Sequence, residues 1–303
     1  MMTIYALKNN KLAEIHEAPF KLEREIQKII EDNLSEVMSL TLVRSEFTIK
    51  NKRIDTLGYD EQAKAFIIIE YKRDKNTSVV DQGFTYLSLM LENKADFVLE
   101  HQGQLNSALK IANVDWSQTR VVFVSPSFTD NQIQATNFKD IAIELWEIKR
   151  YANGSVAVTP IKKAKSAASI KPLTLQNIKL KAISAQIKVW TEDDHRANTS
   201  NETYQLYERF RDAILILADD IEIKPQKFYI AFKKNKNIAC LELQKKKIKI
   251  FIGAKIGKLD DPKGIAKDVS NIGHYGTGDY EVQVSNDNDL EYIMSLVKQA
   301  VHT

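Results

Sequence analysis

Cysteine is almost absent from this sequence. Cys240 is the single cysteine among 303 residues, and the five histidines are scattered along the chain. A lone cysteine excludes an internal disulfide and any zinc site built from several cysteines. The histidines show neither an H-E-x-x-H motif nor another paired-ligand spacing, which excludes the common histidine-based metal motifs.

Long apolar runs are also missing. No stretch is long enough to cross a bilayer, and the first residues lack the apolar core of a secretory signal. The hydrophobic content of 44% and the charged content of 27% are those of an ordinary soluble globular protein. These features predict a cytoplasmic protein that has no membrane partner.

Neither sign of charge is in large excess, because the formal net charge is only +3. The average charge therefore says little about binding to nucleic acid. Lysines nevertheless gather in two parts of the chain, which are Lys162, Lys163, Lys165, Lys171, Lys179 and Lys181, and Lys233, Lys234, Lys236, Lys245, Lys246, Lys247 and Lys249. Such clusters either contact phosphates or form solvated strand edges and loops, and both interpretations stay open.

The chain is long enough for two domains, each with its own core. The stretch 161–176 is rich in lysine and serine and contains Pro172, a composition typical of a linker. We therefore predict a first domain over residues 1–160, a linker over 161–176 and a second domain over 177–303.

Helical and strand patterns alternate in residues 1–160. Apolar residues at helical spacing predict a helix over Phe20–Val37. We also expect strands over 53–59, 66–73, 96–99, 119–124 and 142–148, and helices over 78–92, 105–112 and 130–138. Alternating elements indicate an α/β fold, with a mixed sheet covered by helices on both faces.

Residues 177–303 are predicted to form a smaller α+β domain. We expect helices over 177–190, 202–218 and 289–301, and strands over 228–232, 238–243, 247–252 and 281–284. The glycine-rich segment around His274 lacks a P-loop ending and runs into a strand. Tight-turn glycines therefore explain it better than a phosphate site, and His274 remains a minor candidate for a ligand or base.

A motif of two carboxylates and a lysine stands on two neighbouring strands of the first domain. The polar stretch Asp60–Lys64 separates strands 53–59 and 66–73, which indicates a hairpin. A turn centred between Gln62 and Ala63 places Asp55 opposite Glu70. The two-residue period of a strand then places Lys72 on the same face as Glu70.

This arrangement is suited to hydrolysis of a phosphodiester. Two opposed carboxylates, with Cβ atoms about 5 Å apart, repel each other unless a cation lies between them or one is protonated. Mg²⁺ prefers carboxylate, water and phosphate oxygens, and a lysine ammonium can orient water and offset developing charge. Asp55, Glu70 and Lys72 therefore predict a metal-dependent site, and the alternative is an ion pair or solvated pair at a strand end.

These residues resemble the motif of the PD-(D/E)xK nuclease superfamily, in its restriction-endonuclease-like branch. Arg53-Ile54-Asp55, Glu70-Tyr71-Lys72 and the next helix, which carries Gln82 and Tyr86, make up the resemblance over about half of the chain. Ile54 stands where the family name has proline. The resemblance implies an endodeoxyribonuclease dependent on Mg²⁺ or Mn²⁺, in which Asp55 and Glu70 bind metal and Lys72 is catalytic.

The resemblance also implies supporting residues. A glutamate of the first helix often completes the metal shell; Glu23 is the first choice, with Glu25 and Glu31 as alternatives. A solvated acidic residue near a helix start explains Glu23 equally well. Gln82 is expected near the motif lysine or the substrate. The candidate nucleic-acid contacts are Arg53, Arg73 and Tyr86.

Three functional classes follow from these features. The first is a nuclease whose substrate is DNA and whose second domain selects or holds that substrate. The second is a nuclease-fold module without turnover that binds nucleic acid or a protein partner. The third is a scaffold acting through the second domain, which resembles a small domain of unknown function found with predicted nucleases. The intact set of two acids and a lysine favours the enzyme, and a homodimer is compatible with each class.

Overall fold

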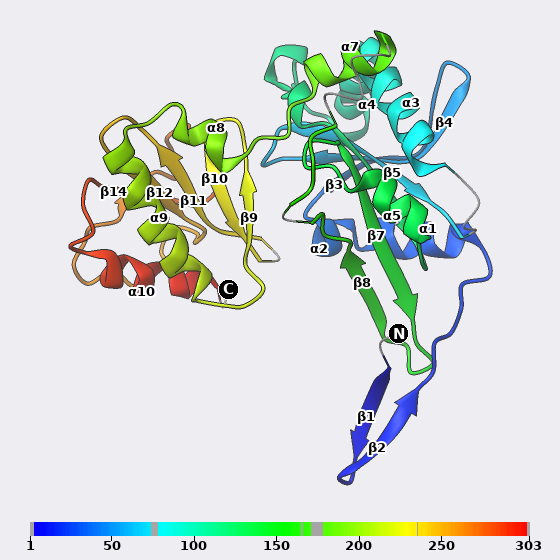
Figure 1. Cartoon of the computed structure of the whole chain (residues 1–303), viewed down its shortest axis with the longest axis horizontal. Helices are drawn as coiled ribbons and strands as arrows, with labels where there is room; N and C mark the ends of the chain where they lie inside the picture. Colours follow the sequence, from blue (N-terminus) through cyan, green and yellow to red (C-terminus); the bar gives the residue numbers. More distant parts are fainter. Residues whose placement is uncertain (1–2, 74–77, 165, 171–177, 235, 302–303) are drawn as a thin grey trace. The chain divides into compact units, whose positions relative to one another are not determined.

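A computed structural model of the chain describes residues 3–73, 78–164, 166–170, 178–234 and 236–301. They fall into two compact units, Met1–Lys188 and Val189–Thr303 (Figure 1). Among these described residues, no helix combines the length and the apolar character that a membrane span needs.

The first unit is built on a six-stranded mixed sheet. The strand order is β3 (Thr41–Ile49), β4 (Lys52–Asp60), β5 (Ala65–Tyr71), β6 (Arg120–Ser125), β7 (Ile143–Arg150) and β8 (Val156–Pro160). β5, β6 and β7 run parallel, and the other neighbours are antiparallel. The expected mixed sheet is confirmed, and β3 and β8 are additions that the sequence patterns did not predict.

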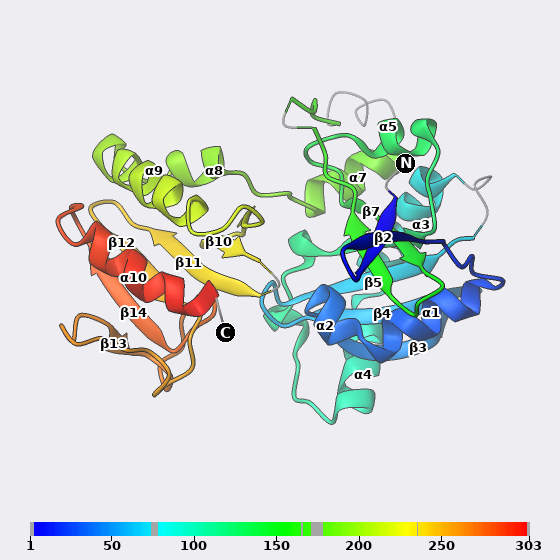
Figure 2. The ribbon, with the colours of Figure 1, turned by 90° about the horizontal axis from the view of Figure 1, so that it is seen from below.

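Helices cover both faces of this sheet, as Figures 1 and 2 show. One face carries α1 (Glu23–Asp32) and α2 (Leu34–Met38), and the other carries α3 (Val79–Glu92), α4 (Lys94–Leu105), α5 (Asp130–Thr136) and α7 (Ile178–Gln186). Two 3-10 turns, Ile111–Asn113 and Trp116–Gln118, lead from α4 to β6. Every residue of β5 is buried, because neither face of this central strand meets solvent.

Three elements of the first unit differ from expectation. The predicted strand 96–99 is wrong, because these residues lie inside α4, where Phe97 and Val98 are buried. The predicted helix 105–112 is also wrong, since α4 ends at Leu105 and Asn106 adopts a left-handed conformation with φ of 49°. The helix expected over 20–37 is divided into α1 and α2 at Asn33. Short apolar runs do not distinguish a strand from a buried helical turn.

The second unit combines one antiparallel sheet with three helices among its described residues. The sheet order is β13 (Lys267–Asp268), β14 (Tyr280–Val284), β12 (Ile248–Ile252), β11 (Asn237–Leu243), β10 (Ile230–Lys233) and β9 (Glu222–Pro225). The helices are α8 (Glu192–Arg196), α9 (Asn201–Leu215) and α10 (Leu290–Val301). α9 and α10 share one apolar core with the sheet, which confirms the expected α+β class.

The boundary between the units differs from the predicted linker at 161–176. α7 belongs to the first unit, because Ile183 and Ile187 are buried in its core and the helix packs on α3. Ile170 is also buried there. Residues 165 and 171–176 of the expected linker lie outside the described residues. Apolar residues in a helix indicate burial, but they do not say which core the helix joins.

Candidate active site

The β4–β5 hairpin has the register that places the two acidic residues together. Leu57 pairs with Ile68, and Tyr59 pairs with Phe66. The Asp60 carboxylate accepts hydrogen bonds from the N–H groups of Gln62 and Ala63, which stabilises the turn between the strands. The predicted pairing is therefore confirmed, and it carries Asp55 to a position opposite Glu70.

Each of the two carboxylates accepts a hydrogen bond from a backbone N–H of the neighbouring strand. Asp55 Oδ2 accepts a hydrogen bond from the Tyr71 N–H at 3.1 Å, and Glu70 Oε1 accepts one from the Asp55 N–H at 3.2 Å. Glu70 is only 2% exposed. These two bonds across the strand pair hold the half-buried Asp55 beside the buried Glu70.

Burial makes ionisation of this acid pair costly. Burial, followed by the nearby Asp55 carboxylate, raises the pKa of Glu70 to about 7 from an ordinary value of 4.5. Burial also raises the pKa of Asp55, against the opposing effects of the Tyr71 N–H and the Lys72 ammonium. Two carboxyl groups that resist ionisation side by side favour either a shared proton or a cation.

Lys72 and Gln82 meet the same carboxylate. Lys72 Nζ lies 3.5 Å from Glu70 Oε2, and Gln82 donates to that oxygen from Nε2 at 3.0 Å. The Gln82 amide also reaches the Tyr86 hydroxyl, which donates to the Arg53 carbonyl oxygen at 3.1 Å. The expected face of α3 is thus directed at the motif.

The position of α3 follows from its own sequence. The Ser78 hydroxyl accepts a hydrogen bond from the Asp81 N–H, so the helix begins at Val79, close to the predicted start at residue 78. Gly83 then lets the helix lie close to the sheet, since a Cβ there would come within 2.5 Å of Ile143 Cδ1. This close approach brings Gln82 to Glu70.

Glu23 is the glutamate of α1 that contacts the motif segment. Its Oε1 accepts a hydrogen bond from the Arg73 N–H at 2.9 Å, and its charge contributes to the raised pKa of Asp55. Glu25 instead pairs with Arg150 at 3.1 Å. Glu31 accepts hydrogen bonds from Thr56 and Gln27, on the opposite side of β4 from Asp55.

The three candidate nucleic-acid contacts differ in accessibility. Arg53 is exposed, and its charge lowers the pKa of Asp55. Arg73 is exposed too, and its guanidinium donates to the Lys21 carbonyl oxygen at 2.7 Å. Tyr86 is buried, so it supports Gln82 from within the unit.

Sequence reasoning missed Gln27 as a part of this site. Its Nε2 donates to the Asp55 carbonyl oxygen at 3.0 Å and ties α1 to the strand that carries the acid. The available signal was its spacing, because Gln27 follows Glu23 by one helical turn and shares its face.

The residues fit a hard divalent cation held by few protein ligands. Within the described ranges, no group of three or more His, Cys, Asp or Glu side chains is arranged to hold a metal. Mg²⁺ usually keeps several waters and takes only one or two carboxylates. Asp55 and Glu70 match that preference, because desolvation raises the pKa of both carboxyl groups, so that a nearby positive charge would favour their ionised forms.

Three lysines of the cluster in the second unit contact side chains of the same unit. Lys249 pairs with Glu281 at 3.3 Å, and Lys234 pairs with Asp220 at 3.4 Å. Lys247 donates to the Gln283 side chain. Of the first cluster, Lys165 and Lys171 lie outside the described residues. The interpretation as solvated strand edges and loops therefore suits these three paired lysines best.

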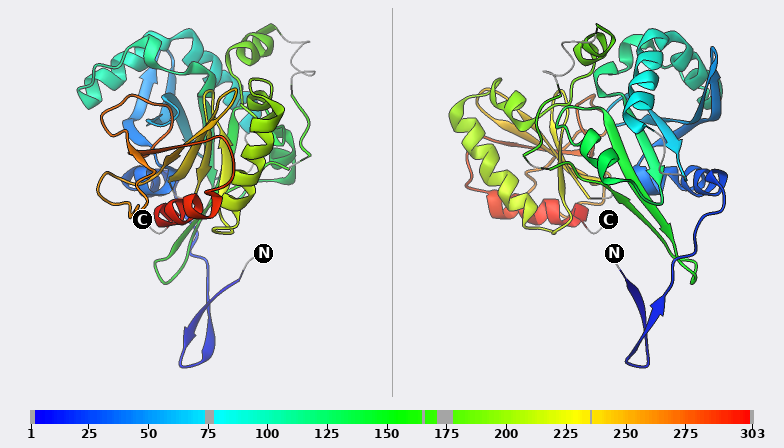
Figure 3. Two further views of the ribbon diagram at one scale, coloured as in Figure 1. Left: turned by 90° about the vertical axis from the view of Figure 1, so that its left-hand side faces the viewer. Right: turned by 45° about the vertical axis from the view of Figure 1, so that its right-hand side comes forward.

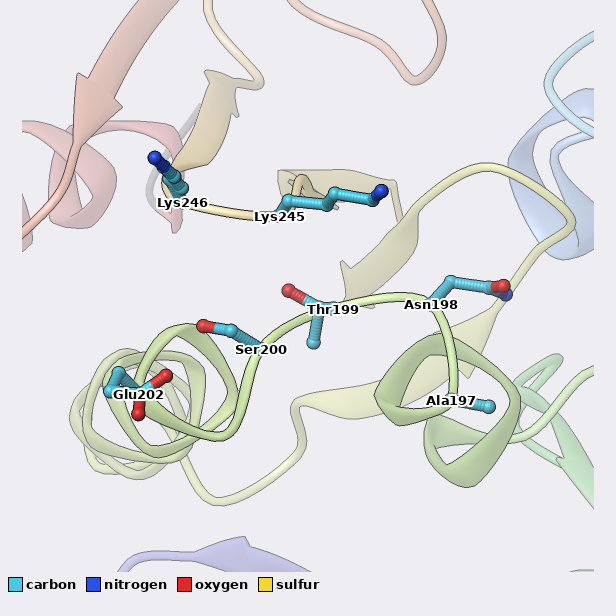
Figure 4. Close-up of a pocket in the computed structure, with 7 residues that line it drawn as sticks. All are labelled: Ala197, Asn198, Thr199, Ser200, Glu202, Lys245 and Lys246. Carbon is cyan, nitrogen blue, oxygen red and sulfur yellow. The ribbon is translucent and has the colours of Figure 1, made fainter.

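One pocket lies in the second unit, between the start of α9 and the turn that joins β11 to β12 (Figure 4). Lys245 and Lys246 border it on one side, opposite Thr199 and Ser200. The Thr199 hydroxyl already donates to the Gln244 carbonyl oxygen, and Ser200 caps α9. The pocket is therefore bordered by two lysines and by the start of a helix.

The turn around His274 has the geometry of a tight turn. Gly278 has φ of 119°, and a Cβ there would lie 1.9 Å from the Ile252 carbonyl oxygen. His274 stacks on Phe251, with ring centroids 4.5 Å apart. The explanation by tight-turn glycines is supported.

Several known proteins resemble parts of this chain. A solved complex of EndoMS with double-stranded DNA is 19% identical over 38% of this chain and 40% of that chain, with a TM-score of 0.26. A repair endonuclease from Pyrococcus abyssi is 18% identical over 40% and 44%, with a TM-score of 0.23. SfsA from Pyrococcus furiosus, solved with Ca²⁺, is 15% identical over 52% and 69%, with a TM-score of 0.26. These likenesses are partial and too distant to bear on function.

The sequence also matches a domain family and a second protein. A domain family of unknown function, DUF5655, matches residues 192–302, which lie within the second unit. An uncharacterized protein of Haemophilus influenzae is 50% identical over 300 residues, covering 99% of both chains. The chain therefore belongs to the same family as this Haemophilus influenzae protein.

Proposed function

We propose that this protein is a metal-dependent nuclease that cleaves phosphodiester bonds in DNA, as an endonuclease. The observation that carries the proposal is the pair of half-buried Asp55 and buried Glu70, with the Lys72 ammonium 3.5 Å from the Glu70 carboxylate. An acid pair that is costly to ionise is a poor choice for stability alone. Its chemistry suits a divalent cation and an anionic substrate.

In this proposal Asp55 and Glu70 hold Mg²⁺ or Mn²⁺, and Glu23 supports them from the start of α1. When bound, the ion would lower the pKa of its water and neutralise charge on the phosphoryl group. Lys72 orients the attacking water and offsets the charge that develops in the transition state. Gln82 fixes the orientation of the Glu70 carboxylate through its hydrogen bond.

Two further residues and the second unit have roles in this proposal. Gln27 holds the Asp55 backbone from α1, so the acid keeps its place when substrate binds. The exposed guanidinium of Arg53 contacts a phosphate beside the cleaved bond. The second unit holds the substrate in this proposal.

The experiment is cleavage of supercoiled plasmid and of single-stranded DNA, with Mg²⁺, with Mn²⁺ and with a chelator. Nicking of the closed circle distinguishes an endonuclease from an exonuclease. Lys72→Ala is expected to reduce the rate by about 10²–10³, the usual effect of losing a group that stabilises developing charge. Lys64→Ala is the matched control, because Lys64 is an exposed lysine of the same hairpin, paired only with Glu61.

Two outcomes would contradict the proposal. Equal cleavage by the wild type and Lys72→Ala would exclude the role given to Lys72. Salt-sensitive DNA binding without cleavage, unaffected by metal or by Asp55→Ala, would favour a binding module instead.

A further inference from the structure

An apolar hairpin stands before the first helix of the first unit. β1 (Ile4–Lys8) and β2 (Lys11–Ile15) pair antiparallel, with Lys8 opposite Lys11. Asn9 and Asn10 both have positive φ, of 49° and 60°, as a two-residue type I′ turn requires. Figures 1 and 3 show the hairpin projecting from the unit, past the turn that joins β7 to β8.

The apolar side chains of this hairpin remain exposed to solvent. Leu7 and Leu12 are each 69% exposed, and Tyr5 is 49% exposed. A two-stranded hairpin by itself is marginally stable in water and becomes stable when further strands or a packed face are added. An exposed edge with apolar side chains is also a template for pairing with another strand.

The base of the hairpin, in contrast, is fixed to its own unit. The Ala18 N–H donates to the Arg150 carbonyl oxygen at 2.7 Å, and the Ala152 N–H donates to the His16 carbonyl oxygen at 2.9 Å. Lys149 pairs with Glu17 at 2.9 Å. The chain thus anchors the hairpin where it leaves the body and presents the apolar strands beyond that anchor.

The direction of the free backbone groups follows from the register. The pair that closes a two-residue turn exchanges both hydrogen bonds, and such pairs alternate along the ladder. Lys8 and Ala6 therefore direct their N–H and C=O groups toward β2. Tyr5 and Leu7 direct theirs outward, from the free edge of β1.

We infer that β1 pairs antiparallel with β1 of a second copy of this chain, about a two-fold axis at Ala6, to form a four-stranded sheet. In this pairing Tyr5 and the partner's Leu7 exchange both of their outward hydrogen bonds. Lys8 lies opposite the partner's Ile4, so no two like charges are opposed. The contact is isologous, with the same patch on both copies, and it closes as a dimer.

Self-pairing through β1 fits better than self-pairing through β2. Around Ala13, the equivalent pairing of β2 would place Leu12 opposite the partner's Glu14, an apolar residue against a carboxylate. Through β1, the pairs next to the axis oppose Tyr5 to the partner's Leu7, which are apolar on both sides, and the charged Lys8 stands only in the outermost pairs. This complementarity of β1 with itself identifies a second copy as the occupant.

Cross-linking tests this pairing directly. Cys240 is buried and is the single cysteine, so an introduced thiol would be the only accessible one. In the proposed dimer the two Ala6 residues form a non-hydrogen-bonded pair with Cα atoms about 4.5 Å apart, within disulfide range. Ala13→Cys is the matched control, because the two copies of Ala13 would be separated by three strand spacings, about 14 Å.

Ala6→Cys is expected to form at least tenfold more disulfide-linked dimer than Ala13→Cys under mild oxidation. Light scattering should give twice the mass of one chain for the wild type and one chain mass for Leu7→Lys. Leu99→Lys, which alters an equally exposed leucine of α4 (63% exposed), should remain dimeric. A monomeric wild type, or equal cross-linking of the two cysteine variants, would overturn the inference. Neither result depends on nuclease activity.

Discussion

Replacing Glu70 with glutamine should stabilise the first unit at neutral pH, although it removes a proposed metal ligand. Burial and the Asp55 carboxylate raise the pKa of Glu70 from 4.5 to about 7. A pKa difference of one unit is worth about 1.4 kcal/mol, so ionised Glu70 costs the folded chain about 3 kcal/mol. Glutamine has nearly the same shape and carries no charge.

The pH dependence has a definite sign. Between pH 4.5 and 7 the folded chain keeps a proton on Glu70, whereas the unfolded chain has lost it. The stability contributed by the protonated side chain is therefore complete below pH 4.5 and is lost as the pH rises through 7. Glu70→Gln should be close to the wild type at pH 5 and about 2–3 kcal/mol more stable at pH 8.

The structure also provides for the new amide. Gln82 Oε1 is buried and has no hydrogen-bond partner among the described residues. A flip of the Gln82 amide would exchange its Oε1 and Nε2 and let this oxygen accept a hydrogen bond from the introduced N–H. The substitution thus need not leave a buried donor unpaired, which would otherwise cost about 1–3 kcal/mol.

The assay is urea denaturation in a chelator at pH 5 and pH 8, followed by the fluorescence of Trp116 and Trp146 in the first unit. Glu61→Gln is the control, because Glu61 is an exposed carboxylate of the same hairpin. Mg²⁺ at ten times its Kd should then stabilise the wild type at pH 8 by about 1.4 kcal/mol, but not Glu70→Gln. A variant that is less stable than the wild type by the same amount at both pH values would refute the reasoning.

Three further predictions concern other parts of the molecule. The affinity for Mg²⁺, measured by calorimetry, should fall about tenfold per pH unit below pH 7, because the ion must displace the Glu70 proton, and a pH-independent affinity would contradict this. Burial lowers the pKa of His101 below 6.5, so the folded chain loses stability as the pH falls from 6.5 to 5. His101→Phe should make this loss smaller in an acid titration, and an unchanged acid transition would count against the prediction. Gly278→Ala should destabilise the second unit by about 2–3 kcal/mol in thermal unfolding, whereas Gly273→Ala, which has open space around it, should have little effect.

The hairpin that carries the motif was predictable because two local signals agree. The polar turn at Asp60–Lys64 separates two strands, and the apolar run 67–69 requires a strand buried on both faces. Once the turn is placed, the strand period determines which side chains oppose each other. The register of Asp55 and Glu70 therefore follows from short-range sequence alone.

Helix α3 was predictable for a similar reason. Ser78 and Asp81 mark its start, and the four-residue spacing of Gln82 and Tyr86 places both on one face. That this face meets Glu70 depends on the helix lying across the sheet, which the expected order of elements implied. Local capping and the fold resemblance together were sufficient here.

Other features depend on tertiary contacts that no local pattern encodes. Residues 96–99 belong to α4 because Phe97 packs into the core from a helix, and a run of three apolar residues is equally compatible with a strand. The apolar residues of α7 would suit a core in either unit, and its burial beside α3 decides its place. Gln27 joins the site only because α1 crosses β4 at Asp55.

The most direct test of the central claim is anomalous scattering from crystals soaked in Mn²⁺ near pH 8. The account predicts a single strong peak between Asp55 and Glu70, about 2.1 Å from an oxygen of each carboxylate, with Lys72 directed toward the same space. A peak elsewhere, or none at this pair at millimolar Mn²⁺, would contradict it.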